Sequence, residues 1–342
     1  MFARHAGLAI AVCVLVLTQR SWSDEPRDKP PSSPHWEKLL GWLPENSETL
    51  MVLQTPYTVP KWVSPQDRHS QLEEMPFSDM IRAVAASLTL AIGDGLLQRE
   101  LQGQKIICTV EGSRGFRAPE NLGLMPYDGC HIMLFEDAAD ETLKKAFKNC
   151  LIKAEKKIEL VGQQVAVFTE KMETDDWSYF ITRPRPNVLI CATDRAFLEE
   201  TLKRIDKVQA TRAFPADLLE WKHVNTKASV WAIRHYRKEA AANDPSSPLR
   251  DKAPANVPDP DAVGFVFWYE GKMTAQARYL SNAKDAVAIA TKGWRLPSVN
   301  TKPAIKQAIP GVVEISADVS ESLVGQMFLL VLLGHLGHGA YL

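Results

Sequence analysis

The sequence predicts an α+β protein built from two domains, each an antiparallel sheet with helices packed on one face. Short apolar strands follow one another through hairpin-length connections, which is typical of antiparallel sheets. Roughly 320 residues remain after a predicted export signal. A chain of this length usually forms two domains, because a single hydrophobic core seldom serves so many residues. A strand, a polar cap and a helix also recur in both halves, which suggests a divergent internal duplication.

The chain begins with the pattern of an export signal. A short basic start precedes an apolar run over residues 6–17, and Ser21 and Ser23 are the small residues that a signal peptidase reads. The run is shorter than the stretch of about 20 apolar residues that spans a bilayer. We therefore expect cleavage after Ser23 and a periplasmic or extracellular protein with no remaining membrane span. The alternative is an uncleaved signal that serves as an anchor.

The charge of the mature chain bears on its partners. Loss of Arg4 and Arg20 with the signal takes the formal net charge from −1 to −3. A chain this close to neutrality lacks the basic excess that nucleic acids attract, so we expect no nucleic-acid partner. The apolar fraction of 45% is that of an ordinary globular protein.

The first domain is predicted over residues 34–210, after a polar, proline-rich leader at 24–33. A short helix follows Pro34, and a helix is expected at 141–148. Apolar runs predict strands at 49–54, 105–111, 131–135, 158–161, 165–170, 177–182 and 188–192.

The second domain is predicted over residues 211–342. A helix at 214–222 leads into it, and two more are expected at 283–294 and 323–336. Strands are expected at 229–234, 263–269, 273–280 and 312–317. Five prolines in residues 243–261 predict a surface loop.

The strand–turn–helix segment VLICATDRAFLEETLKRI lies where many enzymes hold a phosphate. Its turn contains no glycine, although a phosphate-cradling turn needs close backbone approach. Asp194 is instead a good helix N-cap. Glu199 with Lys203 and Glu200 with Arg204 have the spacing of ion pairs on a solvated helix face. We therefore interpret the segment as scaffold.

Three segments carry a resemblance to known proteins. They are LGWLPENSETLMVLQ at residues 40–54, CTVEGSRGFRAPENLGLMPYDGCHIMLFE at 108–136, and VLICATDRAFLEETL at 188–202. On them the chain resembles a group of exported proteins of unknown function from environmental bacteria, over most of the mature sequence. The resemblance implies export and no particular activity.

The best candidate binding loop lies between two predicted strands. It offers Arg114, Phe116, Arg117 and Tyr127. Arginines beside aromatic rings suit a carboxylate, a phosphate or a sugar. The alternative is a structural loop that packs Phe116 and ties Arg117 to a local carbonyl.

The C-terminal segment contains a further, weaker candidate. His335 and His338 are three residues apart on a helical pattern and could face one metal ion, although no third ligand is evident. A frayed helix end is the alternative. The apolar run before them predicts that Leu329, Leu330 and Leu333 pack into the second domain.

Two of the four mature cysteines are candidates for a disulfide. Cys130 begins a strand, and the next helix, ending near Cys150, should return antiparallel across the same sheet. The strand advances about 17 Å along the sheet and the helix returns about 15 Å, so the end of the helix should lie close to the start of the strand. Free thiols are the alternative, because a sheet and a helix layer lie about 10 Å apart and a bridge needs Cα atoms within about 7 Å.

No sequence signature of an enzyme is present, whether a nucleophile elbow, a zinc-protease helix, a phosphate loop or a paired-cysteine motif. We therefore expect an exported, soluble binding or envelope-scaffold protein without a cofactor. Its partner would be a small anionic ligand or an envelope protein. The alternative is an exported, hydrolase-like enzyme with an unrecognised site, which should bring His, an acid and Ser or Cys together.

Overall fold

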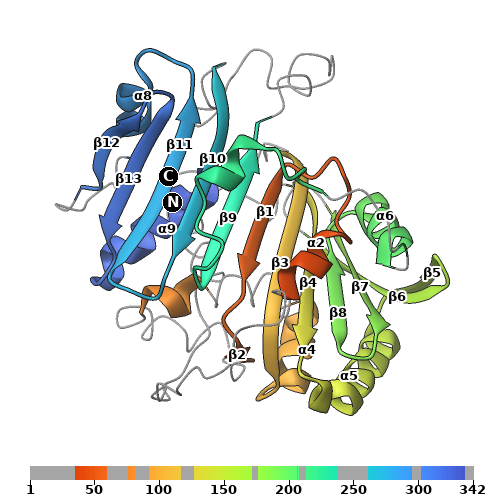
Figure 1. Cartoon of the computed structure of the whole chain (residues 1–342). Coiled ribbons are helices and arrows are strands. Elements are labelled where there is room, and N and C mark those ends of the chain that lie inside the picture. Colours follow the sequence, from red (N-terminus) through yellow and green to blue (C-terminus); the bar gives the residue numbers. More distant parts are fainter. Residues whose placement is uncertain are drawn as a thin grey trace.

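A computed structural model describes residues 35–59, 76–81, 92–116, 127–171, 176–205, 207, 213–236, 261–294 and 302–335. In this part of the chain one large antiparallel sheet of thirteen strands dominates the molecule (Figure 1). The strands are β1 (Thr49–Leu53), β2 (Tyr57–Thr58), β3 (Lys105–Phe116), β4 (Tyr127–Phe135), β5 (Lys156–Leu160), β6 (Gln163–Lys171), β7 (Asp176–Arg185), β8 (Val188–Ala192), β9 (Val230–His235), β10 (Ala262–Tyr269), β11 (Thr274–Ser281), β12 (Ala304–Ile309) and β13 (Val312–Asp318). The antiparallel prediction is confirmed.

The sheet is continuous across both predicted domains. Its order is β12-β13-β11-β10-β9-β1-β3-β4-β8-β7-β6-β5, with β2 added beside β3. The two halves join through β1, which pairs with β3 on one side and β9 on the other. At its centre Met51 lies between Glu111 and Ala232.

Helices cover both faces of the sheet, so the expectation of helices on one face only is wrong. The helical elements are α2 (His35–Leu40), α4 (Ile92–Leu101), η3 (Asp137–Ala139), α5 (Asp140–Lys153), α6 (Arg195–Ile205), η4 (Leu219–Lys222), α8 (Ala286–Gly293) and α9 (Ser322–His335). Every residue of β1 and β8 is buried, because central strands here have apolar neighbours above and below.

The back core lies behind the sheet in Figure 1 and extends across both halves. Helices α4, α5, α8 and α9 supply it, and its largest fully buried side chains include Trp294, Phe265 and Phe328. Leu329 is buried there, as predicted. The side chains of Leu330 and Leu333 lie outside the described part.

The front core is smaller and belongs mainly to the first half and the centre. Helix α2 brings Trp36, Leu39 and Leu40 onto the sheet, and α6 adds Phe197 and Leu198. The stripe of apolar residues on each helix explains this packing, since burial of one such side chain stabilises a fold by about 1.5–3 kcal/mol.

Among the described residues, helices cover the outer strands of the second half on the back. From Thr274 to Tyr279 on β11 and from Val313 to Asp318 on β13, side chains of the back core alternate with half-buried or exposed ones. Leu280 and Val312 are buried as well, but they do not belong to the back core. No helix among the described residues packs against the front of β11, β13 and β12. We call the front of these three outer strands, which carries no described helix, the open front face; η4 lies instead on the front of β9 and β10.

Several predicted features are not described. The export signal (1–23), the leader (24–33) and all but the last residue of the loop at 243–261 lie outside the described ranges. The structure also adds β12, an exposed edge strand that the sequence did not predict. Where a helix was expected at 214–222, only the short η4 forms.

Candidate functional site

The segment from β8 to α6 is built as scaffold. The Phe197 N–H donates to the Asp194 carboxylate over 2.6 Å, so Asp194 caps α6 as expected. Lys203 donates to Glu199 over 2.6 Å, which confirms the first predicted ion pair. Glu200 does not take Arg204 as its partner. It accepts from Arg114, while Arg204 donates to Glu45 and to the Gly41 carbonyl.

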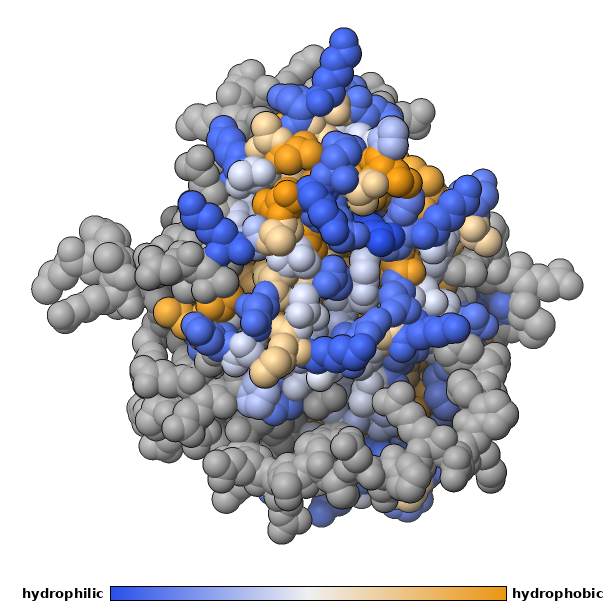
Figure 2. Space-filling view, turned by 60° about the vertical axis from the view of Figure 1, so that its left-hand side comes forward, coloured by the Kyte–Doolittle hydropathy of each residue, from blue (hydrophilic) through white to orange (hydrophobic). Residues whose placement is uncertain are grey.

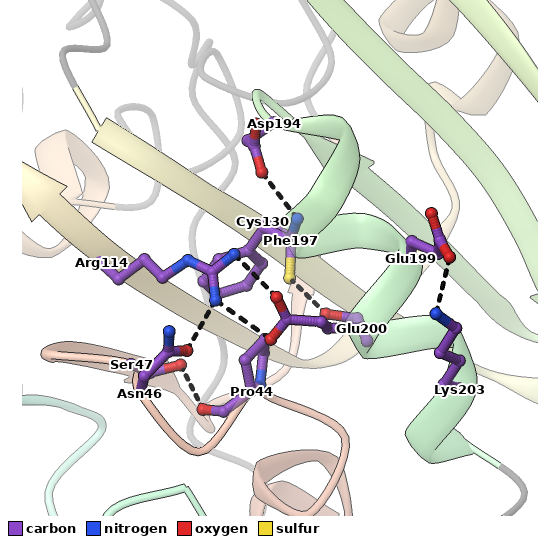
Figure 3. A network of polar contacts seen from close by, with 11 residues as sticks. Pro44, Asn46, Ser47, Arg114, Cys130, Asp194, Phe197, Glu199, Glu200 and Lys203 are labelled. Carbon is purple, nitrogen blue, oxygen red and sulfur yellow. Dashed lines mark hydrogen bonds and ion pairs between the residues drawn. The ribbon is translucent and has the colours of Figure 1, made fainter.

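Arg114, the first residue of the predicted binding loop, is engaged within the protein (Figure 3). Its guanidinium forms two hydrogen bonds to Glu200, of 2.9 and 3.0 Å, and a third of 2.7 Å to Asn46. It also lies over the Phe197 ring at 5.2 Å. These contacts join β3 to α6 and to the turn after α2. They occupy the guanidinium N–H groups that a ligand carboxylate would need.

The other residues of that loop are only partly described. Phe116 ends β3 and pairs with Tyr127, the first residue of β4, but their side chains are outside the described part, as is all of Arg117. Ligand binding by Arg117, Phe116 and Tyr127 stays a prediction. The structure gives Arg114 a structural role.

The four cysteines in the described part of the chain, Cys108, Cys130, Cys150 and Cys191, are free and buried. Cys130 faces the front core and Cys150 the back core, so the predicted bridge between them is wrong. Helix α5 does return across the sheet, but the strand alternation turns Cys130 to the opposite face. Burial raises the pKa of both thiols to about 12, so they have little thiolate at neutral pH.

The metal prediction at the C-terminus is not tested. His335 ends α9 with its side chain undescribed, and His338 lies outside the described residues. Elsewhere in the described part, no group of three or more His, Cys, Asp and Glu side chains is placed to hold a metal ion.

A group of polar side chains is buried on the back of β1, β3 and β4. They share less than 5% exposure and comprise Thr49, Thr109, Glu111, Ser113 and His131. His131 Nδ1 lies 3.5 Å from Glu111 Oε2, across the β3–β4 pair. Burial lowers the pKa of His131 to about 4, so its imidazole is neutral at pH 7 despite the nearby carboxylate.

A second Glu–His pair lies at the front of the sheet, and the sequence did not predict it. Glu220 of η4 is fully buried, and its Oε1 lies 2.7 Å from Nδ1 of His235, the last residue of β9. The His235 side chain is 27% exposed, so this imidazole can be reached from solvent. Gly264 on β10 makes room, because a side chain there would overlap Glu220 Oε1.

The open front face of the second half carries a third polar group. Arg278 of β11 stacks on Trp268 of β10, 5.1 Å from its ring. It lies 3.4 Å from Glu314 of β13, which also binds Lys306 of β12 at 3.0 Å. We call these four residues the Arg278 patch. Figure 2 shows this side of the molecule, where long hydrophilic side chains cross a surface with hydrophobic residues between them.

The guanidinium of Arg278 forms fewer and longer hydrogen bonds within the protein than that of Arg114. Its two described hydrogen bonds, to Glu314 and to the His223 carbonyl, are both 3.4 Å long. Its Nε is buried and has no hydrogen-bond partner among the described residues, so only the two Nη atoms can meet a ligand. Charge-assisted hydrogen bonds normally measure about 2.7–2.9 Å, so the two bonds of 3.4 Å leave these Nη atoms able to form shorter ones.

A pattern in the sequence could have indicated the Arg278 patch. In TAQARYLS, small and aromatic residues alternate with Gln276 and Arg278 at a period of two. This alternation places the polar pair on the face opposite the core. The sequence therefore predicts a polar strand face beside Trp268.

Comparisons with protein-family models, with curated proteins and with solved structures found no match to this chain. Within the described ranges, no helix has the length and apolar character needed to cross a bilayer.

Proposed function

We propose that the protein is an exported binding protein that takes a small anionic ligand on the Arg278 patch. The observation that carries this proposal is the guanidinium of Arg278, stacked on Trp268 and held by two hydrogen bonds of 3.4 Å. Its side chain is 29% exposed. A ligand carboxylate or phosphate can therefore approach it and form shorter, charge-assisted bonds.

The charges of the patch favour an anion. Two cations, Arg278 and Lys306, share the single carboxylate of Glu314. The hydrogen bond from Lys306 is the largest of the effects that lower the pKa of Glu314, so that carboxylate is engaged chiefly with the lysine. One positive charge remains for a ligand. The Trp268 ring gives the ligand an apolar contact beside that charge.

We further propose that the two predicted domains, 34–210 and 211–342, are diverged copies of one unit. The order of strands supports this, because β1-β3-β4-β8-β7 in the first half corresponds to β9-β10-β11-β13-β12 in the second. Helix α5 follows β4 as α8 follows β11, and both contribute to the back core.

One difference between the halves explains why the patch is open. The helix after β8 is α6, and it packs on the front face. The helix after β13 is α9, and it packs on the back face against Phe265, Phe267 and Trp294. Among the described residues, the front of β11, β13 and β12 thus carries no helix corresponding to α6, and this is the surface we assign to the ligand.

Export is part of the proposal and has its own test. The pattern of residues 1–23 supports a cleaved signal, as does the resemblance to exported proteins. N-terminal sequencing of protein recovered from the periplasm or medium should begin at Asp24. An intact Met1 recovered in the membrane fraction would show an anchor instead.

Calorimetric titration tests the binding function. Phosphate, acetate, succinate and citrate would be titrated into the mature protein, with uncharged glycerol as the comparison. At least one anion should bind, and Arg278→Gln should weaken it at least tenfold, about 1.4 kcal/mol. Arg185→Gln, at an exposed arginine of β7 far along the sheet, is the matched control and should bind as the wild type does. Equal binding by the Arg278 and Arg185 variants would refute the assignment.

A further inference from the structure

We infer that His235, oriented by Glu220, is a general-base site that activates water to hydrolyse a carboxylic ester. This activity goes beyond the proposed binding function and does not depend on the Arg278 patch. Its basis is a buried carboxylate bonded to one nitrogen of an imidazole that solvent can reach.

The hydrogen bond between Glu220 and His235 sets the state of the ring. A carboxylate 2.7 Å from Nδ1 accepts the proton carried by that nitrogen. The neutral ring is then held in the tautomer whose Nε2 has a free lone pair. When Nε2 takes a proton, the same carboxylate stabilises the imidazolium that forms.

The position of Glu220 is fixed by its surroundings. The carboxylate is fully buried, and its Oε2 has no hydrogen-bond partner in the described part of the chain. A buried carboxylate with an unused oxygen costs stability, which a purely structural contact would not require. The cost is offset if the negative charge is needed opposite a ring that becomes positive.

The backbone holds the imidazole in place as well. The His235 N–H donates to the Glu48 carbonyl over 2.8 Å, and the strand pairs His235 with Gly264. Because Gly264 has no side chain, η4 can place Glu220 directly over the strand beside the ring. Both members of the pair are thus fixed before any substrate arrives.

The pair of Glu111 and His131 provides an internal comparison. There the imidazole is 2% exposed and lies 3.5 Å from its carboxylate. Burial lowers its pKa to about 4, and neither water nor substrate can reach it. Of these two pairs, the one at His235 combines a short hydrogen bond with an accessible ring.

The reaction uses water as the nucleophile. Nε2 of His235 takes one proton from a water molecule while the water oxygen forms a bond to the ester carbonyl carbon. The resulting tetrahedral intermediate breaks its bond to the alkoxy oxygen, and that oxygen takes the proton back from Nε2. One ester and one water give one carboxylic acid and one alcohol, and the histidine is regenerated.

Hydrolysis of phenyl acetate by the purified full-length mature protein tests the inference. The wild type should release phenol above the buffer rate, and His235→Gln should lower kcat about 100-fold, as expected for loss of a general base. His35→Gln, at an exposed histidine of α2, is the matched control and should keep the wild-type rate. Glu220→Gln should lower kcat with little change in KM, because Glu220 positions the base and does not contact the substrate.

A chemical measurement covers the case in which a variant does not fold. Diethyl pyrocarbonate modifies accessible neutral imidazoles, so in the folded wild type His235 should react before His131 and phenol release should stop with its modification. No hydrolysis above buffer, or full activity after modification of His235, would overturn the inference. Either result leaves anion binding at Arg278 unaffected, so the two proposals fail separately.

Discussion

The unfolding free energy should fall in mild acid because His131 is buried. The size of the fall is set by how far burial lowers the pKa of its ring. Its pKa falls from the ordinary 6.5 to about 4 in the folded chain, because burial disfavours the charged ring. The unfolded chain therefore binds a proton at this site over a range in which the folded chain does not. This contribution to stability is complete above about pH 6.5, is lost as the pH falls toward 4, and changes little below that.

The magnitude follows from the shift. Each unit of pKa is worth about 1.4 kcal/mol, so lowering the pH from 7.5 to 4 should remove about 3 kcal/mol of unfolding free energy through His131 alone. Since small proteins have only about 5–15 kcal/mol in total, such a loss is readily measured.

Urea unfolding followed by tryptophan fluorescence provides the assay. Wild type and His131→Gln would be compared at pH 7.5 and at pH 4, and the variant should lose about 3 kcal/mol less between them. Carboxylates titrate in both proteins and cancel in the comparison. Glu111 faces the ring, so the pair of measurements is repeated with Glu111→Gln in both chains.

His35→Gln is the control for the loss of a histidine, because His35 is exposed on α2. It should keep the acid sensitivity of the wild type. If wild type and His131→Gln lose the same free energy between the two pH values, the ring is already protonated or already solvated in the folded protein, and the reasoning from burial is refuted.

Three further predictions concern the scaffold. Gly264→Ala should destabilise the protein by about 1–3 kcal/mol, because the methyl group overlaps Glu220, whereas Gly41→Ala meets only an ordinary contact and serves as the control; equal melting temperatures would contradict this. Denatured protein produced without residues 1–23 should titrate four thiols without reductant, and a count of two would show a disulfide. Arg114→Gln should cost about 0.5–1.5 kcal/mol by removing two charge-assisted hydrogen bonds to Glu200, whose side chain is 44% exposed, and unchanged urea unfolding would argue against that role.

The local elements could be predicted from the sequence where apolar periodicity was strong. Strand β8 was expected at its observed bounds, and α6 begins directly after its predicted cap, Asp194. The edge strand β12 was missed because its six residues are mostly exposed and lack a buried alternation. An exposed strand next to prolines has the composition of a loop, and only pairing with β13 identifies it.

The faces of the sheet could not be predicted from local patterns. The strand that starts near Cys130 and the helix that ends near Cys150 have the expected directions. Whether Cys130 faces that helix depends on the register of β4 with β3, which sequence spacing does not fix. The same register places Glu111 beside His131, a pair 20 residues apart in the chain.

The use of Arg114 within the protein could not be predicted for a related reason. Arginines beside aromatic residues predict a ligand site at Arg114, Phe116, Arg117 and Tyr127, which stays a prediction for the last three residues. The partner of Arg114, Glu200, comes from a helix 86 residues later, which no local pattern indicates. Arg278 lay within a strand whose alternation was readable, but its exposure depends on α9 packing behind the sheet. Which face of these strands stays open is thus decided by the packing of the whole fold and not by the local sequence.

The Trp268 indole N–H provides the most direct test of the proposed binding surface. Its signal in a ¹⁵N–¹H correlation spectrum can be assigned by its disappearance in Trp268→Phe, and the anion that binds in calorimetry is then titrated into ¹⁵N-labelled mature protein. We predict a saturable shift of this indole signal in the wild type, and its loss in Arg278→Gln but not in Arg185→Gln. A titration in which the Trp268 indole signal stays fixed while the anion binds would place the ligand elsewhere and contradict the account.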